Sequence, residues 1–263
     1  MAGHWRTKTR FVILYFPQVH RPHVGNVSDE YIPENNPMNN RQPHFVIAIV
    51  IFLSSVAAVA GTCNTIEASD EENFVALFDG KSLAGWEGNL KIFRVEDHAI
   101  VAGSNDKRVA NNEFLCTKKE FGDFELRLKA KLTGQGKNAG IQFRSKRIPN
   151  HHEVIGYQCD MGISGAKHVI WGALYDESRR RTFLAEGDQK KLTAALKTDD
   201  WNDFIIRCEG RRIQIWLNGY QTVDYKEAED IARTGVIALQ IHGGKPAVAS
   251  YKDILIKELP AKK

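Results

Sequence analysis

The chain has 263 residues, of which 43% are hydrophobic and 26% are charged, and its formal net charge is +4. This is the composition of an ordinary globular protein and excludes a disordered, fibrous or disulfide-rich chain. No basic helix or clustered stripe of Lys and Arg accompanies the positive charge, which argues against a nucleic-acid partner.

The N-terminal region differs in composition from the rest. Phe45–Ala60 is an apolar run that follows Arg41 and ends in an A-x-A sequence, the pattern of a secretory signal peptide. A membrane span needs about 20 apolar residues, so an uncleaved membrane anchor is the weaker alternative. Because Met38 directly precedes a normal polar leader, we expect residues 38–60 to be the signal peptide. Residues 1–37 are then a spurious or disordered extension.

Cleavage after Ala60 would remove five basic and three acidic residues, lowering the net charge from +4 to +2, and predicts a secreted or periplasmic protein. A lipoprotein is less well supported, because Thr62 precedes Cys63 where a small residue is expected. The cysteines show no C-x-x-C spacing and no dense framework. Three of them fall in strand-like runs, so buried thiols are at least as well supported as a bridge (Cys63, Cys116, Cys159 and Cys208).

Residues 61–73 form an acidic lead-in, and residues 74–260 predict one domain of about 190 residues, large enough to bury its own core. In the clearest strand, Phe124–Leu132, apolar residues alternate with Glu, Arg and Lys. The other predicted strands are Phe74–Phe78, Leu83–Trp86, Ile92–Val95, Ala99–Ala102, Phe114–Thr117, Asn138–Ser145, Val154–Asp160, Val169–Tyr175, Phe204–Cys208, Arg212–Leu217, Gly235–His242 and Tyr251–Lys257.

Only two short segments, Asp188–Leu196 and Glu227–Ile231, have helical character. About a dozen short strands separated by turns predict an all-β fold, a two-sheet antiparallel jelly-roll sandwich. In such folds one sheet is often concave and carries the functional site.

Three of the predicted strands carry polar side chains where a solvated face would usually show Lys, Glu and Thr. Gly235–His242 is followed by a Gly-Gly turn, which permits close approach of another group. If the three strands are neighbours, their polar faces merge into a surface suited to hydroxyl and carbonyl groups. Trp171 and Tyr175 would add an aromatic wall for sugar rings. The polar residues are Gln142, Arg144, Gln158, Asp160, Gln240 and His242.

Each of these features also has a structural explanation. Arg144 can form an ordinary ion pair with Asp160, and Trp171 can fill the core. Residues 151–153, His-His-Glu, resemble a metal cluster in composition only, because adjacent side chains on a strand point apart. We therefore expect a loop there, with a metal site as the minor alternative. The three arginines at 179–181 are expected to form a solvated loop, with anion binding as the alternative.

Familiar catalytic motifs are missing from the sequence. It contains no G-x-S-x-G, no Gly-rich phosphate loop and no H-E-x-x-H. It also lacks a closely spaced set of carboxylates on one strand, which argues against a conventional two-carboxylate glycosidase.

Segments spread over residues 77–259 resemble the 3-keto-disaccharide hydrolase domain family, which is similar in fold to concanavalin A-like lectins and glucanases. Each segment is weak alone, but the ordered set is specific. Where the family often has Glu in a G-Y-E motif, this chain has Gln158, and its carboxylate appears at Asp160. The segments are LFDGKSLAGW, FGDFELRLKAKL, NAGIQFRS, GYQCDMG, GALYDESRR, DDWNDFIIRCEGRRIQIWLNG, GVIALQIHGG and YKDILIKEL.

The resemblance implies an oligosaccharide or glycoside whose glucosyl unit is already oxidised at C3. The ketone acidifies the C2 proton, whose removal allows the C1 substituent to leave before water adds. The reaction needs a base, an acid and a group that stabilises the enolate. Asp160 or His242 would transfer the protons, and Arg144 with Gln142 or Gln240 would hold the enolate. A divalent cation could replace the arginine, but no ligand set and no other cofactor is evident.

Two other classes of function stay open. A non-catalytic carbohydrate-binding module would use the same fold, and a surface or scaffold protein would bind no sugar. The combination of Arg, Asp and His favours the enzyme, because recognition by stacking does not require it. The sequence does not indicate the leaving group, the anomeric preference or the oligomeric state.

Overall fold

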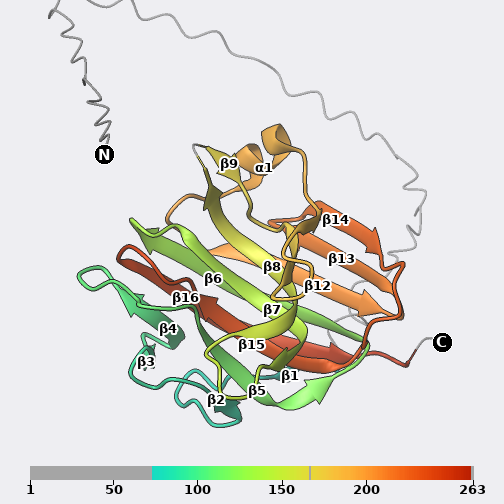
Figure 1. Ribbon diagram of the computed structural model, residues 1–263, viewed down its shortest axis with the longest axis horizontal. Coiled ribbons are helices and arrows are strands. Elements are labelled where there is room, and N and C mark those ends of the chain that lie inside the picture. Colours follow the sequence, from blue (N-terminus) through green and yellow to red (C-terminus); the bar gives the residue numbers. More distant parts are fainter. Residues whose placement is uncertain (1–72, 166, 262–263) are drawn as a thin grey trace, which may run out of the picture. The chain divides into compact units, whose positions relative to one another are not determined.

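The computed structural model describes residues 73–165 and 167–261. The predictions for residues 1–60, and for all but the last residue of the acidic lead-in, lie outside them. The described residues form two eight-stranded antiparallel sheets, which confirms the predicted all-β sandwich. Strands that are distant in the sequence lie side by side, as Figure 1 shows for the red strand β16 (Ala247–Glu258) beside the green β6 (Phe124–Gly134).

Sheet A has the order β14-β13-β12-β6-β16-β4-β3, and β1 also pairs with β16. Besides β6 and β16, its strands are β1 (Val75–Ala76), β3 (Phe93–Glu96), β4 (Ala99–Ser104), β12 (Asn202–Glu209), β13 (Arg212–Leu217) and β14 (Tyr220–Lys226).

Sheet B has the order β11-β10-β8-β7-β15-β5-β2, and β9 also pairs with β8. The short helix α1 (Gln189–Ala195) lies with β9 at one end of the sandwich, away from β2 and β5 (Figure 1). The strands are β2 (Trp86–Glu87), β5 (Glu113–Phe121), β7 (Asn138–Arg147), β8 (Val154–Ser164), β9 (His168–Val169), β10 (Leu174–Glu177), β11 (Phe183–Ala185) and β15 (Gly235–Ile241).

The core follows from the period-two alternation of the strands. In β6, the apolar residues Leu126, Leu128, Ala130 and Leu132 are buried, while the charged residues that alternate with them from Arg127 to Lys131 are half-buried. Ile141 of β7 and Leu239 of β15 belong to the same core cluster. The alternate residues of β7, β8 and β15 therefore lie on the outer face of sheet B, the face turned away from this core.

The two helix predictions had different outcomes. The helix predicted over Asp188–Leu196 is confirmed, since α1 begins after an aspartate whose side chain accepts a first-turn N–H at 2.9 Å. The helix predicted over Glu227–Ile231 is wrong. The side chain of its first residue, Glu227, is buried and accepts hydrogen bonds from Tyr157 and Arg180. These bonds hold the segment in an irregular conformation.

The strand predicted over Val169–Tyr175 is interrupted. A turn at Gly172, with φ of +73°, separates β9 from β10. Strands β11 and β14 have no counterpart in the prediction, because neither segment shows clear alternation.

The cysteines in the described region are buried free thiols, at positions 116, 159 and 208, so the interpretation without a bridge holds for these three. Cys63 lies outside the described residues. Within residues 73–261, no helix is long and apolar enough to cross a membrane.

Candidate functional site

The register of sheet B brings four predicted polar residues onto one outer face. Strand β7 lies between β8 and β15, and Gln142 is directly opposite Gln158. Two residues earlier on β7, Gly140 has Asp160 of β8 on one side and Gln240 of β15 on the other. The strands that carry these residues are neighbours, as the sequence analysis supposed.

A series of hydrogen bonds crosses this face and ends on Asp160. The hydroxyl of Ser145 donates to the Gln142 amide oxygen at 2.9 Å, and the Gln142 nitrogen donates to the Gln158 oxygen at 2.5 Å. The Gln158 nitrogen in turn donates to a carboxyl oxygen of Asp160. The Asp160 side chain is therefore held in one orientation.

Gly140 makes room for this series. A Cβ atom at this position would lie 2.6 Å from the Gln158 Cδ atom, which is too close for two carbon atoms that are not bonded to each other. The bare backbone of Gly140 allows the Gln158 side chain to lie across β7 and reach Asp160.

Asp160 lies in a hollow of about 260 Å³ on the outer face. The Tyr175 and Phe183 rings form one side of it and meet edge to face, with centroids 5.1 Å apart. His242 is an exposed residue of the same hollow. The lining residues are Asn112, Asn138, Gln158, Asp160, Ser164, Ile170, Tyr175, Glu177, Phe183 and His242.

Burial changes the acidity of Asp160. The desolvation of its carboxylate raises the pKa of Asp160 to about 8, although the hydrogen bond from Gln158 acts in the opposite direction. The negative charges of Glu177 and Glu186 raise this pKa further. A carboxyl group with such a pKa can both accept and release a proton near neutral pH.

His242 follows β15 directly, and its ring has a defined tautomer. Its Nδ1 lies 2.6 Å from the carbonyl oxygen of Gly243. Because a carbonyl oxygen can only accept, Nδ1 carries the hydrogen. The other ring nitrogen, Nε2, is then the one that can accept a proton and donate it again.

Gln240 lies across Gly140 from Asp160 and is buried with an unsatisfied side chain. Neither its amide nitrogen nor its amide oxygen has a hydrogen-bond partner among the described residues. Buried amides are normally satisfied, so the unsatisfied amide of Gln240 is unusual.

The expected position of Arg144 on this surface is wrong. A β-bulge between Phe143 and Lys146 gives Arg144 a φ of +48° and turns its side chain away from Asp160. Its guanidinium donates to the carbonyls of Gly122 and Gly210 and pairs with Asp123 at 2.6 Å.

The bulge also explains why Ser145 takes the place of Arg144 on the outer face. The two neighbouring strands accommodate it with glycine. A Cβ atom at Gly235 of β15 would lie 2.5 Å from the Ser145 carbonyl oxygen, and one at Gly156 of β8 would lie 2.2 Å from the Ser145 hydroxyl oxygen. Arg144 joins the β5–β6 and β12–β13 turns to strand β7 and therefore has a structural role.

Trp171 does not contribute to an aromatic wall. It is 5% exposed and stacks on Phe204 in the core, with ring centroids 6.0 Å apart. Its neighbours nonetheless support the site, because the Asp160 backbone accepts a hydrogen bond from Gly172 and donates one to Ala173. Of the two predicted aromatic residues, only Tyr175 lines the hollow.

Family membership follows from the sequence as a whole. Residues 73–257 match the model of the 3-keto-alpha-glucoside-1,2-lyase-like domain. The chain belongs to this family. The resemblance seen in the ordered segments is thereby confirmed, and membership supports a function that involves carbohydrates. No curated protein matches the sequence.

Solved structures with the same fold are distant in sequence. A Parabacteroides distasonis protein proposed to be a glycosyl hydrolase superposes with a TM-score of 0.55 at 20% identity, over 74% of this chain and 97% of its own. The exoplasmic domain of VIP36, in its Ca²⁺- and Man3GlcNAc-bound form, has a TM-score of 0.51 at 10% identity, over 73% and 91%. At these identities the likeness shows the fold alone.

Several residues that line the hollow around Asp160 were not predicted from the sequence. Asn112 and Phe183 come from outside the three polar strands, and Glu177 follows Tyr175 on β10 by two residues. That spacing places both side chains on one face and was a usable signal for Glu177. Burial raises the pKa of Glu177, and the charge of Glu153 raises it further.

The two charged clusters singled out in the sequence differ in how well they match the prediction. Residues 151–153 form a loop, as expected. Among residues 73–165 and 167–261, no group of three or more His, Cys, Asp and Glu side chains could hold a metal ion. The solvated loop predicted at 179–181 is wrong in part, since Arg179 and Arg180 both pair with the buried Asp176.

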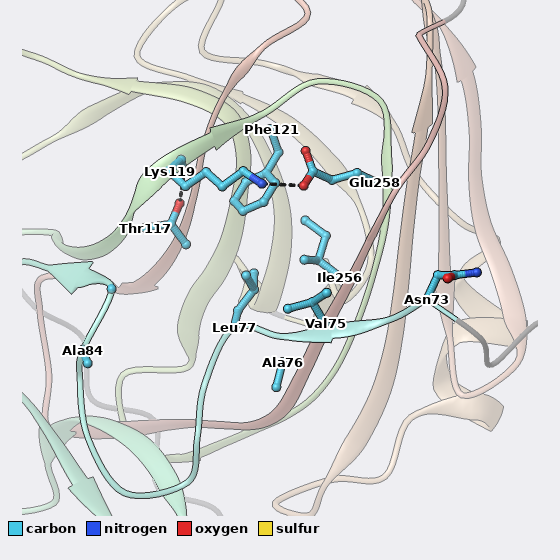
Figure 2. A pocket seen from close by; sticks show the side chains of 11 residues that line it. Asn73, Val75, Ala76, Leu77, Ala84, Thr117, Lys119, Phe121, Ile256 and Glu258 are labelled. Atoms are coloured by element: carbon cyan, nitrogen blue, oxygen red, sulfur yellow. Dashed lines mark hydrogen bonds and ion pairs between the residues drawn. The ribbon is translucent and has the colours of Figure 1, made fainter.

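A larger hollow of about 440 Å³ lies elsewhere, between β1 and β5. Figure 2 shows Leu77 and Ile256 in its wall and the ion pair between Lys119 and Glu258 beside it. It contains none of the polar residues of the outer face of sheet B, and the hollow around Asp160 is the better candidate.

Proposed function

We propose that the protein cleaves 3-keto-glycosides by elimination at C1 and C2, followed by hydration. The observation that carries the proposal is the buried Asp160, oriented by Gln158 and with a pKa of about 8, in a hollow lined by Tyr175 and Phe183. The reaction requires a single base of moderate strength, which Asp160 can supply. The second carboxyl group of the hollow, Glu177, has no part in the proposed step.

In the proposed reaction, ionised Asp160 removes the proton from C2, and the electrons of the C2–H bond pass to the C3 oxygen as an enolate. The enolate collapses to the ketone, a C1–C2 double bond forms and the C1–O bond breaks. Nε2 of protonated His242 gives its proton to the departing oxygen. Addition of water, with hydroxyl to C1 and a proton to C2, completes a net hydrolysis without any change of oxidation state.

The developing enolate requires a hydrogen-bond donor that is not already engaged. Gln240, which lies across Gly140 from Asp160, supplies an unpartnered, buried amide nitrogen. Gln142 donates to Gln158 and so orients the base, and the Arg144 guanidinium is held by carbonyl groups and Asp123. We therefore assign the enolate to Gln240.

The sequence outside the described region adds a proposal about location. The apolar run before Ala60 supports export to the periplasm or the medium, with residues 74–260 as the mature domain. An exported enzyme would meet oligosaccharides or glycosides directly.

The test compares a 3-keto-disaccharide with the same sugar unoxidised, incubated with the protein from Gly61 onward. Release of 3-ketoglucose from the oxidised substrate alone is the expected result. Cleavage of both sugars would indicate an ordinary hydrolase and overturn the elimination. Tight binding of either sugar without cleavage would indicate a carbohydrate-binding module instead.

A further inference from the structure

A second hollow adjoins the one that contains Asp160. It has a volume of about 300 Å³ and lies beyond the end of β15. Two residues, Asn112 and His242, line both hollows and form the boundary between them. A ligand larger than one sugar ring would therefore extend from the first hollow past His242 into the second.

The Gly-Gly turn after β15 builds this second hollow. Val109 and Gly244 pair as an isolated bridge, and the Gly243 N–H donates to the Asn112 side chain at 2.9 Å. A Cβ atom at Gly243 would lie 2.8 Å from the Asn111 backbone. Glycine at this turn thus lets the loop before β5 close against the end of β15.

The lining of the second hollow differs from that of the first. Arg108, Asn111 and Glu153 are polar, and His152 has its Nδ1 hydrogen directed to the Asn112 carbonyl at 3.2 Å. Among the described residues that line it, the only apolar side chain is a small alanine and there is no Phe, Tyr or Trp. The first hollow, in contrast, has two aromatic rings.

From this arrangement we infer that the second hollow is the leaving-group subsite and that it takes a polyhydroxylated group, such as a second sugar, in preference to a flat aromatic one. The inference rests on the proposed function, which places the oxidised ring against Asp160. His242 then stands at the boundary where the glycosidic oxygen lies. Arg108 and Asn111 are positioned to bind hydroxyl groups of the leaving sugar.

Arg108 offers the clearest variant, because it is exposed and its removal leaves the core intact. The substrates are a 3-keto-disaccharide and methyl 3-ketoglucoside, whose methyl group is too small to reach the second hollow. Arg108→Ala should raise the KM for the disaccharide about tenfold, the loss of roughly one charge-assisted hydrogen bond, and leave the KM for the methyl glucoside unchanged. Lys107→Ala, a neighbouring exposed cation that does not line this hollow, is the control and should change neither value.

Binding measured by calorimetry to Asp160→Asn separates this inference from the catalytic proposal. In that background the disaccharide should bind about tenfold more tightly than the methyl glucoside, and Arg108→Ala should remove the difference. If Arg108→Ala removes this difference in affinity although the native protein cleaves neither substrate, the subsite is supported and the proposed function is wrong. Equal binding of both compounds, binding of neither, or a difference that survives Arg108→Ala would overturn the subsite.

Discussion

Replacement of Asp160 by Asn should stabilise the protein at alkaline pH and change little at acid pH. In the folded protein burial raises the pKa of Asp160 from its ordinary 3.8 to about 8. Between these values the folded state keeps a proton that the unfolded state has lost. The free energy of unfolding of the wild type is therefore highest, with respect to this group, below pH 4. It decreases as the pH rises and stops decreasing above about pH 8.

The size of the effect follows from the two pKa values. Each pKa unit corresponds to about 1.4 kcal/mol, so the free energy of unfolding of the wild type should fall by about 3 kcal/mol near pH 6 and about 6 kcal/mol above pH 8. Asparagine resembles the protonated carboxyl in shape and can still accept the hydrogen bond from Gln158, so the variant should not show this decrease.

Urea unfolding at pH 4, 6 and 9, with wild type and variant compared at each pH, measures the difference directly. Asp230→Asn is the matched control, because the side chain of Asp230 is 96% exposed and should give the same stability as the wild type throughout. A variant that is less stable than the wild type at pH 9 would show that the folded protein favours the ionised carboxylate, and would refute the reasoning about Asp160.

Three further substitutions probe the site and its support. Gly140→Ala puts a methyl group against the Gln158 side chain and should lower kcat about tenfold with KM little changed; an unchanged kcat would contradict the role of the hydrogen-bond series. Gln240→Met removes no hydrogen bond to a described residue, so stability in urea should stay within about 1 kcal/mol while kcat falls about 100-fold, and full activity would exclude Gln240 as the enolate donor. Arg144→Met removes a buried guanidinium that bonds Asp123 and the carbonyls of Gly122 and Gly210, and should cost about 3–5 kcal/mol in urea unfolding; a loss of kcat at undiminished stability would instead return Arg144 to the catalytic group.

The fold could be predicted because its physical basis is local. Strands such as Phe124–Leu132 alternate apolar and charged residues, and that alternation determines which side chains enter the core. Short pieces such as β11 and the break at Gly172 depend on contacts between distant segments. They left no periodic signal in the sequence.

The candidate site was predicted in part for the same reason. Gln158, Asp160 and Gln240 occupy the face that strict alternation assigns to them. Arg144 does not, because one extra residue in the bulge reverses the side on which it lies, and a bulge is decided by the neighbouring strands. Asn112 entered the hollow from a loop, whose path no alternation could indicate.

The central claim is that Asp160 removes the C2 proton of an oxidised sugar, and isotope incorporation tests it most directly. The protein and a 3-keto-disaccharide are incubated in D₂O, and the 3-ketoglucose released is analysed for deuterium at C2, with an enzyme-free sample to measure spontaneous exchange. We predict one deuterium at C2 in every product molecule, and neither cleavage nor enzyme-dependent exchange with Asp160→Asn. Cleavage that leaves hydrogen at C2, or that continues in Asp160→Asn, would contradict the account.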